Sequence, residues 1–292
     1  MQPRQSLPFR AWDVRCPHRR LSGRSRCVRV LSSRRDHSSR GGLTRPSSHG
    51  PPVSDTLAGA SRRGFLRSPE VVFSFTAIAA LTLWPPVHAL DLRLAALFFD
   101  AAVGAWFFPP DDRGAAYWLL YRGPKILLVV VGAISLLWLA WRGVTKRWQS
   151  FDTRFLAALL VLGLTALLVG FIKKSTGVSC PVQETVFAGP YPHVAIWDRL
   201  LALVPSNEHL RCWPAGHASA GFGLLGIRVL APVHARLSWR YLMPGLAGGW
   251  VLGLYQMARG QHYFSHTVVT MAIALILSAA AIAILDRIED RG

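Results

Sequence analysis

Long uncharged apolar runs alternate with short polar and basic connections over most of the chain after residue 69. An α-helix needs roughly 20 apolar residues to cross the ~30 Å hydrocarbon layer of a membrane. The repeated runs therefore predict an all-α polytopic membrane protein, a six-transmembrane-helix bundle. The six predicted spans are residues 70–89, 125–142, 155–172, 215–231, 241–258 and 265–285.

Lysine and arginine gather in the connections 142–154 and 232–240 and in the amino-terminal segment. Cytoplasmic loops of membrane proteins carry an excess of these residues, so we expect both connections and both termini to be cytoplasmic. The connections 90–124, 173–214 and 259–264 then lie outside. This orientation predicts a multi-pass protein of the bacterial inner (cytoplasmic) membrane whose outer loops face the periplasm.

The outer connection 90–124 is aromatic and amphipathic, but Asp91, Arg93 and Asp100 interrupt its apolar residues. A segment of this kind is typical of helices that lie in the interface between lipid and water. We expect it to lie there, either as simple packing or as one lip of a lateral entrance for a lipid.

Residues 1–69 have a different composition from the rest of the chain. They hold fifteen arginines against three acids, so that +12 of the formal charge of +18 lies there. Few apolar residues are available to offset the entropy of ordering. We expect a disordered, Arg-rich cytoplasmic tail followed by a membrane domain over 70–292. Such a tail could bind nucleic acid or anionic lipid, but we favour a true start of the protein further downstream and expect no nucleic acid partner.

Three polar clusters fall at the outer ends of predicted spans. A positive charge beside paired imidazoles suits an anionic group, and phosphate is the commonest such substrate. A short polar turn between spans is the simpler alternative for the third cluster. The clusters comprise Lys173 and Lys174 at the end of the third span, Arg211 and His217 at the start of the fourth, and Arg259, His262 and His266 where the fifth and sixth spans meet.

Each cluster has groups suited to phosphoryl transfer. Pro214 suits a first helical turn, so the amide of Gly216 can hold phosphate oxygens near His217. His262 lies near the amino end of the sixth predicted span, where the helix dipole favours the neutral imidazole that a nucleophile needs. The lysines and arginines would neutralise the phosphoryl oxygens.

These clusters resemble the three signature motifs of the type-2 phosphatidic acid phosphatase superfamily, whose fold is shared with vanadium haloperoxidases. Lys173 fits the lysine of the first motif, Pro214-Ala-Gly-His217 fits the second, and His262 fits the histidine of the third. The resemblance implies that His262 attacks phosphorus and forms a phosphohistidine, while His217 protonates the leaving oxygen and then activates water. It implies phosphate binding by Lys173 and Gly216, and neither a metal nor another cofactor.

The chain departs from these motifs at four positions. His266 stands where the family has an aspartate, and Gln256 stands at an arginine position, for which Arg259 would substitute from one turn further on. Ala215 replaces a serine, and Cys180 replaces an arginine. The resemblance and an oxidising outer compartment favour a disulfide between Cys180 and Cys212, which would carry Arg211 next to the vacated arginine position.

Other polar residues have simpler interpretations. A zinc site at His217, His262 and His266 is an alternative, but no carboxylate or cysteine of ligand spacing joins these histidines in the sequence. We expect His193 to be a loop residue and Glu184 to be solvated.

The sequence thus predicts an integral membrane phosphatase that hydrolyses a lipid-linked phosphate or diphosphate. Lipid A, undecaprenyl diphosphate and phosphatidate types are all compatible with it. Its partners would be this lipid phosphate and membrane lipids, and the sequence predicts no oligomeric state. A lipid phosphotransferase and a non-catalytic phospholipid-binding or transport protein are the alternatives.

Overall fold

The computed structural model describes residues 65–291 except 85, 110, 112 and 202–209. The predicted tail lies almost wholly outside the described residues. The part of the chain that is described is mainly helical, which confirms the all-α prediction in its general form. Its one sheet is an antiparallel pair, β1 (Phe99–Asp100) and β2 (Ala105–Trp106).

The helices follow one another along the chain with short connections. The connection between α6 (Ser150–Thr176) and α8 (Ala218–Phe222) contains two short 3-10 helices, η2 (Pro181–Gln183) and η3 (Thr185–Phe187), and the helix α7 (Ile196–Leu200). The helices are α2 (Pro69–Leu83), α3 (Pro86–Ala96), α4 (Ala115–Tyr117), the π-helix η1 (Trp118–Arg122), α5 (Gly123–Val144), α6 (Ser150–Thr176), η2 (Pro181–Gln183), η3 (Thr185–Phe187), α7 (Ile196–Leu200), α8 (Ala218–Phe222), the 3-10 helices η4 (Gly223–Leu230) and η5 (Val233–Ala235), α9 (Trp239–Ala258) and α10 (Phe264–Glu289).

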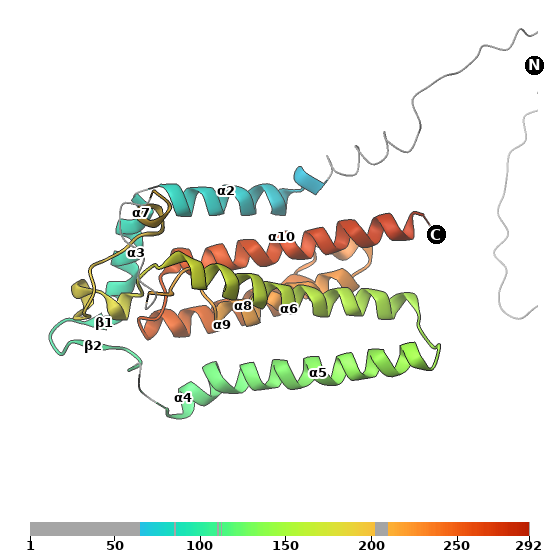
Figure 1. The fold of residues 1–292 in the computed structure, drawn as a ribbon, viewed down its shortest axis with the longest axis horizontal. Coiled ribbons are helices and arrows are strands. Elements are labelled where there is room, and N and C mark those ends of the chain that lie inside the picture. The colour runs from blue at the N-terminus through green and yellow to red at the C-terminus, as the bar shows by residue number, and fades with distance from the viewer. Residues whose placement is uncertain (1–64, 85, 110, 112, 202–209, 292) are drawn as a thin grey trace, which may run out of the picture. The chain divides into compact units, whose positions relative to one another are not determined.

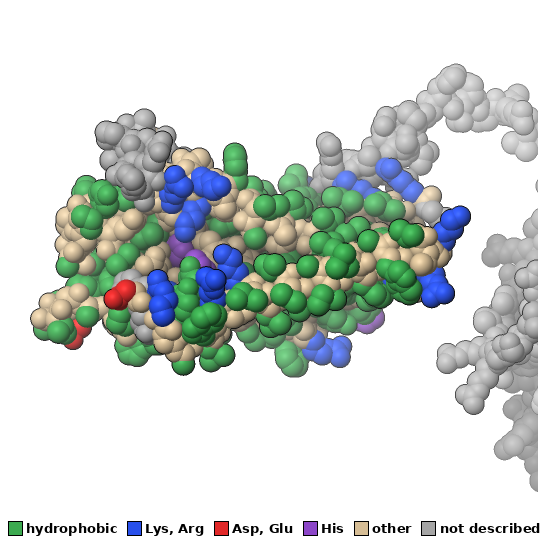
Figure 2. All heavy atoms as spheres, turned by 60° about the horizontal axis from the view of Figure 1, so that its bottom comes forward, with side chains coloured by type: hydrophobic (Ala, Val, Ile, Leu, Met, Phe, Trp, Pro, Cys, Tyr) green, Lys and Arg blue, Asp and Glu red, His purple; other side chains and the backbone are tan. Residues whose placement is uncertain are grey.

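The long helices lie side by side, and α10 packs against α2, α6, α8, η4 and α9 (Figure 1). Half of the most apolar part of α10 is buried inside the protein, whereas α5 buries little besides Leu139. Apolar side chains cover the length of the helices and Lys and Arg side chains gather toward the ends (Figure 2). Apolar sides between charged ends are what a bilayer requires of a bundle that spans it.

Among the described residues, three helical segments are long and apolar enough to cross a membrane: Ala115–Val144, Ser150–Gln183 and Phe264–Glu289. A fourth is possible if α2 and α3, which meet at an angle of 86°, together make one broken span. The predicted number of six is therefore not established. The predicted span 215–231 contains only the shorter apolar helix Ala218–Leu230.

The predicted span 241–258 corresponds to α9, which is not among these apolar segments. Glycines stand in α9 at positions where larger apolar side chains would raise its hydropathy. A Cβ atom on Gly249 would lie 2.1 Å from the ring of Phe222, and one on Gly245 would lie 2.6 Å from Leu225. Glycine lets α9 approach α8 and η4 closely, as small residues do between helices in membranes. In α9, glycines that allow close helix packing therefore replace side chains that would make the helix more apolar.

Ion pairs join helix ends at the end of the bundle away from Lys173 and His266. Arg236 binds Asp286 through two hydrogen bonds of 2.6 Å, and Arg154 lies 2.5 Å from Glu289. Arginines in the connections that we predict to be cytoplasmic thus pair with acids near the carboxyl end of α10.

Candidate functional site

Backbone hydrogen bonds bring the three polar clusters to one end of the bundle. The amide of Cys212 donates to the carbonyl of Val178 just after α6, over 3.0 Å. The amide of Ala215 donates to the carbonyl of His266 over 3.2 Å, and the hydroxyl of Thr270 donates to the carbonyl of Ala215 over the same distance. The segment before α8 therefore lies between the end of α6 and the first turns of α10.

A disulfide between Cys180 and Cys212 holds the same segments, with a Cα–Cα distance of 5.1 Å. Both residues are buried. The bond links the start of η2 to the segment before α8 across 32 residues of chain. Closing a loop of this length is worth roughly 3–4 kcal/mol in the chain-entropy model.

Lys173 lies in the last turn of α6, next to the segment before α8. A Cβ atom placed on Gly216 would be 3.6 Å from the Nζ atom of Lys173. The ammonium group therefore lies close to the backbone of Gly216. An oxyanion near this point would meet a positive charge at close range.

His217 precedes α8, and its ring lies 4.2 Å from the ring of Tyr121, between centroids. Burial lowers the pKa of the His217 imidazole to about 4. Positive charges add to this shift in pKa, in the order Lys173, Lys125 and Arg259. The free site therefore holds His217 neutral at physiological pH.

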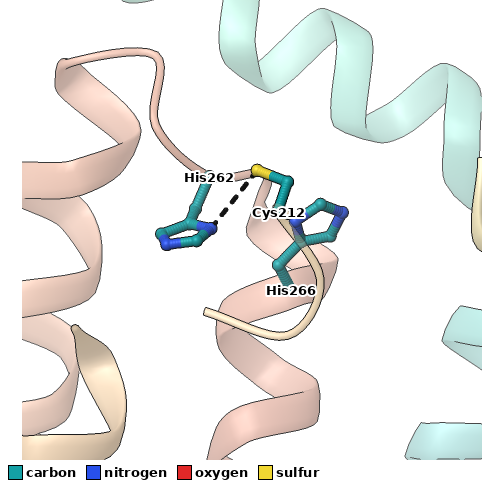
Figure 3. Close-up of side chains that lie close together, drawn as sticks. All are labelled: Cys212, His262 and His266. Carbon is teal, nitrogen blue, oxygen red and sulfur yellow. Dashed lines mark hydrogen bonds between the residues drawn. The ribbon is translucent and has the colours of Figure 1, made fainter. Parts of the chain in front are cut away.

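His262 is buried in the connection between α9 and α10, with 2% of its surface exposed. Its Nδ1 atom lies 3.5 Å from the Sγ atom of Cys212 (Figure 3). Burial lowers its pKa well below the usual value, and the charge of Lys173, followed by His266 and His217, lowers that pKa further. A neutral imidazole with an available lone pair is the form in which histidine acts as a nucleophile.

His266 lies one turn into α10 and is 4% exposed. Its ring centroid is 6.1 Å from that of His262, and among the described residues no hydrogen bond joins the two rings. Cys212 lies beside both rings instead (Figure 3). The Nδ1 atom of His266 has no hydrogen-bond partner in the described part of the chain.

Arg259 ends α9 and is 4% exposed. Its guanidinium lies 5.7 Å from the ring of Tyr117 and 5.5 Å from those of Tyr121 and Tyr255, within the range of cation–π interactions. Gly260 follows with a φ of +66°, where a Cβ atom would meet the ring of Trp106 at 2.3 Å. The tyrosines hold Arg259 toward His217, whose pKa it lowers.

Arg211 is exposed in the segment between α7 and α8. It directly precedes Cys212, whose disulfide partner is Cys180, the residue at the position of the family's arginine. Phosphate binding by its side chain stays a prediction.

A large apolar cavity of about 690 Å³ leads to His217 between α5, α6 and α8. Leucine, alanine, valine and glycine side chains form most of its wall. Its polar groups are Tyr121, Lys125, Ser219 and His217, with Gly216 beside the imidazole. A cavity with apolar walls and one polar end suits a molecule with a hydrocarbon chain and a charged head.

Cys212, His262 and His266 offer three potential metal-ligand atoms that lie within 4.8 Å of one another (Figure 3). The sequence spacing gave no sign that a cysteine would join the two histidines. Zinc binds cysteine as a thiolate, however, and the sulfur of Cys212 belongs to a disulfide. While this bond is intact, the group offers two imidazoles, and structural and catalytic zinc sites use at least three protein ligands.

Glu184 was predicted to be solvated, and this is wrong: it is fully buried. It accepts hydrogen bonds from the hydroxyls of Ser179 (2.8 Å) and Tyr263 (2.6 Å), and its carboxylate lies 2.6 Å from the Nδ1 atom of His193. Three partners replace the water that a buried carboxylate loses. The sequence offered no signal for these contacts, because Ser179 and His193 lie in irregular loop segments and Tyr263 is 79 positions away.

Asp91 was predicted to interrupt an interfacial segment, but it is 5% exposed and points into the protein. It accepts hydrogen bonds from the amide of Ser265, over 2.9 Å, and from the hydroxyl of the same residue. Tyr121 and Lys125 are two further site residues that the sequence reasoning missed, because they stand where interfacial residues begin a span.

Comparison with known proteins gives one match: residues 154–290 fit the model of a family described as the PAP2 superfamily. No curated protein and no solved structure matches the chain. The matched region runs from the first turn of α6 to the end of α10 and contains all three polar clusters. Asp91, Tyr121 and Lys125 lie outside it.

Proposed function

We propose that this chain, which belongs to the PAP2 superfamily through residues 154–290, is an integral membrane enzyme that hydrolyses a lipid-linked phosphate or diphosphate. Members of this superfamily are phosphatases that act on phosphate esters. Several long apolar helices fit a membrane protein.

One observation carries the proposal: an apolar cavity of about 690 Å³ ends at His217, whose pKa the charge of Lys173 lowers together with that of His262. The three side chains are thus within electrostatic reach of one another, and one of them, His217, lines a space that fits hydrocarbon. A lipid phosphate whose chain lies in the cavity would present its phosphoryl group to them.

The superfamily resemblance supplies the order of events. A ring nitrogen of His262 attacks phosphorus, so that a nitrogen–phosphorus bond forms while the bond from phosphorus to the leaving oxygen breaks. His217 gives its proton to that oxygen. Water then attacks the phosphohistidine and passes a proton to His217, and the nitrogen–phosphorus bond breaks to release inorganic phosphate and neutral His262.

His217 must carry a proton when the substrate is bound, although the free site holds it neutral. A phosphate dianion placed beside its ring favours the charged imidazolium and raises its pKa. Lys173 and the amide of Gly216 would hold the phosphoryl oxygens as charge develops on them.

The test is release of inorganic phosphate by the purified protein from a panel of phosphatidate, undecaprenyl diphosphate and lipid A in mixed micelles. We expect activity on at least one lipid, and its loss to background in His262→Ala. His234→Ala is the matched control, because His234 is an exposed histidine of η5 outside the site. Activity retained by His262→Ala, or none on any lipid phosphate, would contradict the proposal.

The position of His266 favours one alternative, a protein that binds phospholipid without catalysis. The family's aspartate is absent there, and His266 makes no hydrogen bond to His262 among the described residues. The same assay distinguishes the two functions, because a binding protein would retain a lipid phosphate unchanged.

A further inference from the structure

His266 occupies the position of the family's aspartate, so the motif itself brings no negative charge to His262. Two buried carboxylates nevertheless lie near the first turn of α10: Asp91 of α3, which binds Ser265, and Glu184 between η2 and η3, which binds Tyr263. Asp91 comes from α3 and Glu184 from the connection between α6 and α8, and neither belongs to the three motifs.

A small cavity of about 30 Å³ lies between α3, the segment 193–197 and the first turn of α10. Its wall includes the polar or ionisable side chains of His88, Asp91, His193, Trp197, Tyr263, Ser265 and His266. A cavity needs about 10–15 Å³ of this kind of volume to hold a water molecule, together with two to four polar partners. The volume suffices for one water, and the wall supplies candidate polar partners.

Asp91 can accept more hydrogen bonds than Ser265 donates to it. Each of its oxygens takes one hydrogen bond from Ser265 and keeps a second lone pair. His266 also has unused capacity, since its Nδ1 atom is buried without a partner among the described residues. Leaving such an atom unsatisfied costs about 1–3 kcal/mol.

Glu184, by contrast, is not available to a water molecule in the cavity. Ser179, Tyr263 and His193 already surround its carboxylate, and it does not line the cavity. The link from Glu184 toward His266 is the ring of Tyr263, which meets the imidazole edge to face at 5.3 Å and offers no hydrogen bond along that path.

We propose that a water molecule in this cavity joins His266 to Asp91, so that Asp91 is a positioning residue for the nucleophile His262. The water accepts a hydrogen bond from one ring nitrogen of His266 and donates one to a carboxylate oxygen of Asp91. The other ring nitrogen then stays unprotonated. It would accept the ring proton of His262 once substrate draws together the two rings, whose centroids are 6.1 Å apart in the free site. One ring nitrogen of His266 faces Cys212 and the other points to the opposite side (Figure 3).

This arrangement would restore through three groups what the family achieves with one carboxylate. An anion behind the imidazole pair stabilises the positive charge that His262 gains on attacking phosphorus. The inference rests on the proposed function for its catalytic part and on the cavity for its structural part. The two parts are tested separately.

The structural part is tested by an experimental density map of the native protein in lipid nanodiscs, at a resolution that shows ordered water. We expect one water within hydrogen-bond distance of a ring nitrogen of His266 and an oxygen of Asp91. A dry cavity, or a water that contacts only one of the two residues, would overturn the proposal whether or not the protein is a phosphatase.

The catalytic part is tested by Asp91→Asn, which keeps the shape of the side chain and one acceptor for Ser265. We expect kcat to fall roughly ten- to hundredfold, as for other groups that orient a reactive residue, with KM unchanged within about twofold. Asp100→Asn is the control, because Asp100 is an exposed acid of β1, which follows α3.

His266→Asp separates positioning from a structural role, because it places a carboxylate directly beside His262. In that background Asp91→Asn should change kcat less than about threefold, since the relay is no longer needed. An equal loss of kcat in both backgrounds, or no loss in the native one, would overturn the proposal.

If Asp91→Asn does not fold, Ala195→Val gives the same comparison without touching a charge. Ala195 lines the cavity, so the larger side chain displaces the water. Its loss of kcat should likewise disappear with His266→Asp. Absence of all phosphatase activity in the native protein would refute the proposed function instead, and the density map would still decide the relay.

Discussion

Two neutral imidazoles beside a lysine are the chemical centre of the site at the scale of single residues. Burial lowers the pKa of both His217 and His262, and the charge of Lys173 lowers each further. Lys173 therefore has two roles in the proposed mechanism. It attracts the phosphoryl group, and it keeps the nucleophile unprotonated and ready to attack.

Lys173→Met tests both roles. We expect kcat/KM to fall by roughly a hundredfold or more, as on removal of an oxyanion-hole donor. The pKa of His262 should rise, because a charge that disfavours its protonation is gone, so the acidic limb of the profile of kcat/KM against pH should move to higher pH.

Lys174→Met is the matched control for this variant, because Lys174 is the next residue of α6 and is exposed. It should leave both the rate and the acidic limb unchanged. An acidic limb that stays in place, or moves to lower pH, in Lys173→Met would contradict the electrostatic role of Lys173.

At the scale of elements, the site depends on how η2, the segment before α8 and the first turn of α10 are held together. The disulfide between Cys180 and Cys212 is the covalent part of this connection, and the hydrogen bonds of Cys212 and Ala215 are the rest. Since Cys212 lies beside His262, a displaced segment would also displace the nucleophile's surroundings.

We predict that Cys180→Ser lowers thermal stability and activity together. The chain-entropy model gives a loss of up to roughly 3–4 kcal/mol in the free energy of unfolding. Thiol labelling followed by peptide mass spectrometry should find Cys180 and Cys212 unlabelled in the native protein until a reductant is added. Labelling of both residues in folded protein without reductant would contradict the bond.

The helices α5 and α6 carry the second prediction at this scale, which concerns the apolar cavity between them. Ala133 lines it, so Ala133→Trp should reduce the space for a hydrocarbon chain. We expect lower kcat/KM for long-chain lipid phosphates and little change for a short-chain, water-soluble phosphatidate.

Ala140→Trp is the control for this variant, because two helical turns separate Ala140 from Ala133 on the same face of α5 and Ala140 does not line the cavity. Equal effects of the two variants on both substrates would show that the cavity does not take the lipid chain.

At the scale of the whole molecule, the sequence predicts the helical class and the positions of Lys173, His217 and His262 well. Polar residues are easy to find in an apolar chain, and spans that alternate in direction bring every second connection to one surface. The number of spans was harder to predict, because hydropathy does not show that the glycines of α9 serve close packing.

The segment that contains α3 and the connection between α6 and α8 were the least predictable parts of the fold. Asp91 binds Ser265 across 174 positions, and Glu184 binds Tyr263 across 79. No local pattern shows such pairings, so Glu184 was expected to be solvated and Asp91 was read only as an interruption of an interfacial segment. The superfamily motifs have the same limit, since Asp91 lies outside the matched region.

Trapping of the phosphoenzyme tests the proposed mechanism most directly. The native protein and His217→Ala would be mixed with lipid phosphate labelled with ³²P and quenched rapidly in base, in which phosphohistidine is stable. We predict an acid-labile label on the peptide that contains His262. In His217→Ala this label should form more slowly and persist longer, because protonation of the leaving oxygen and activation of water are both lost. A label on another residue, or an active enzyme that never becomes labelled, would contradict the mechanism.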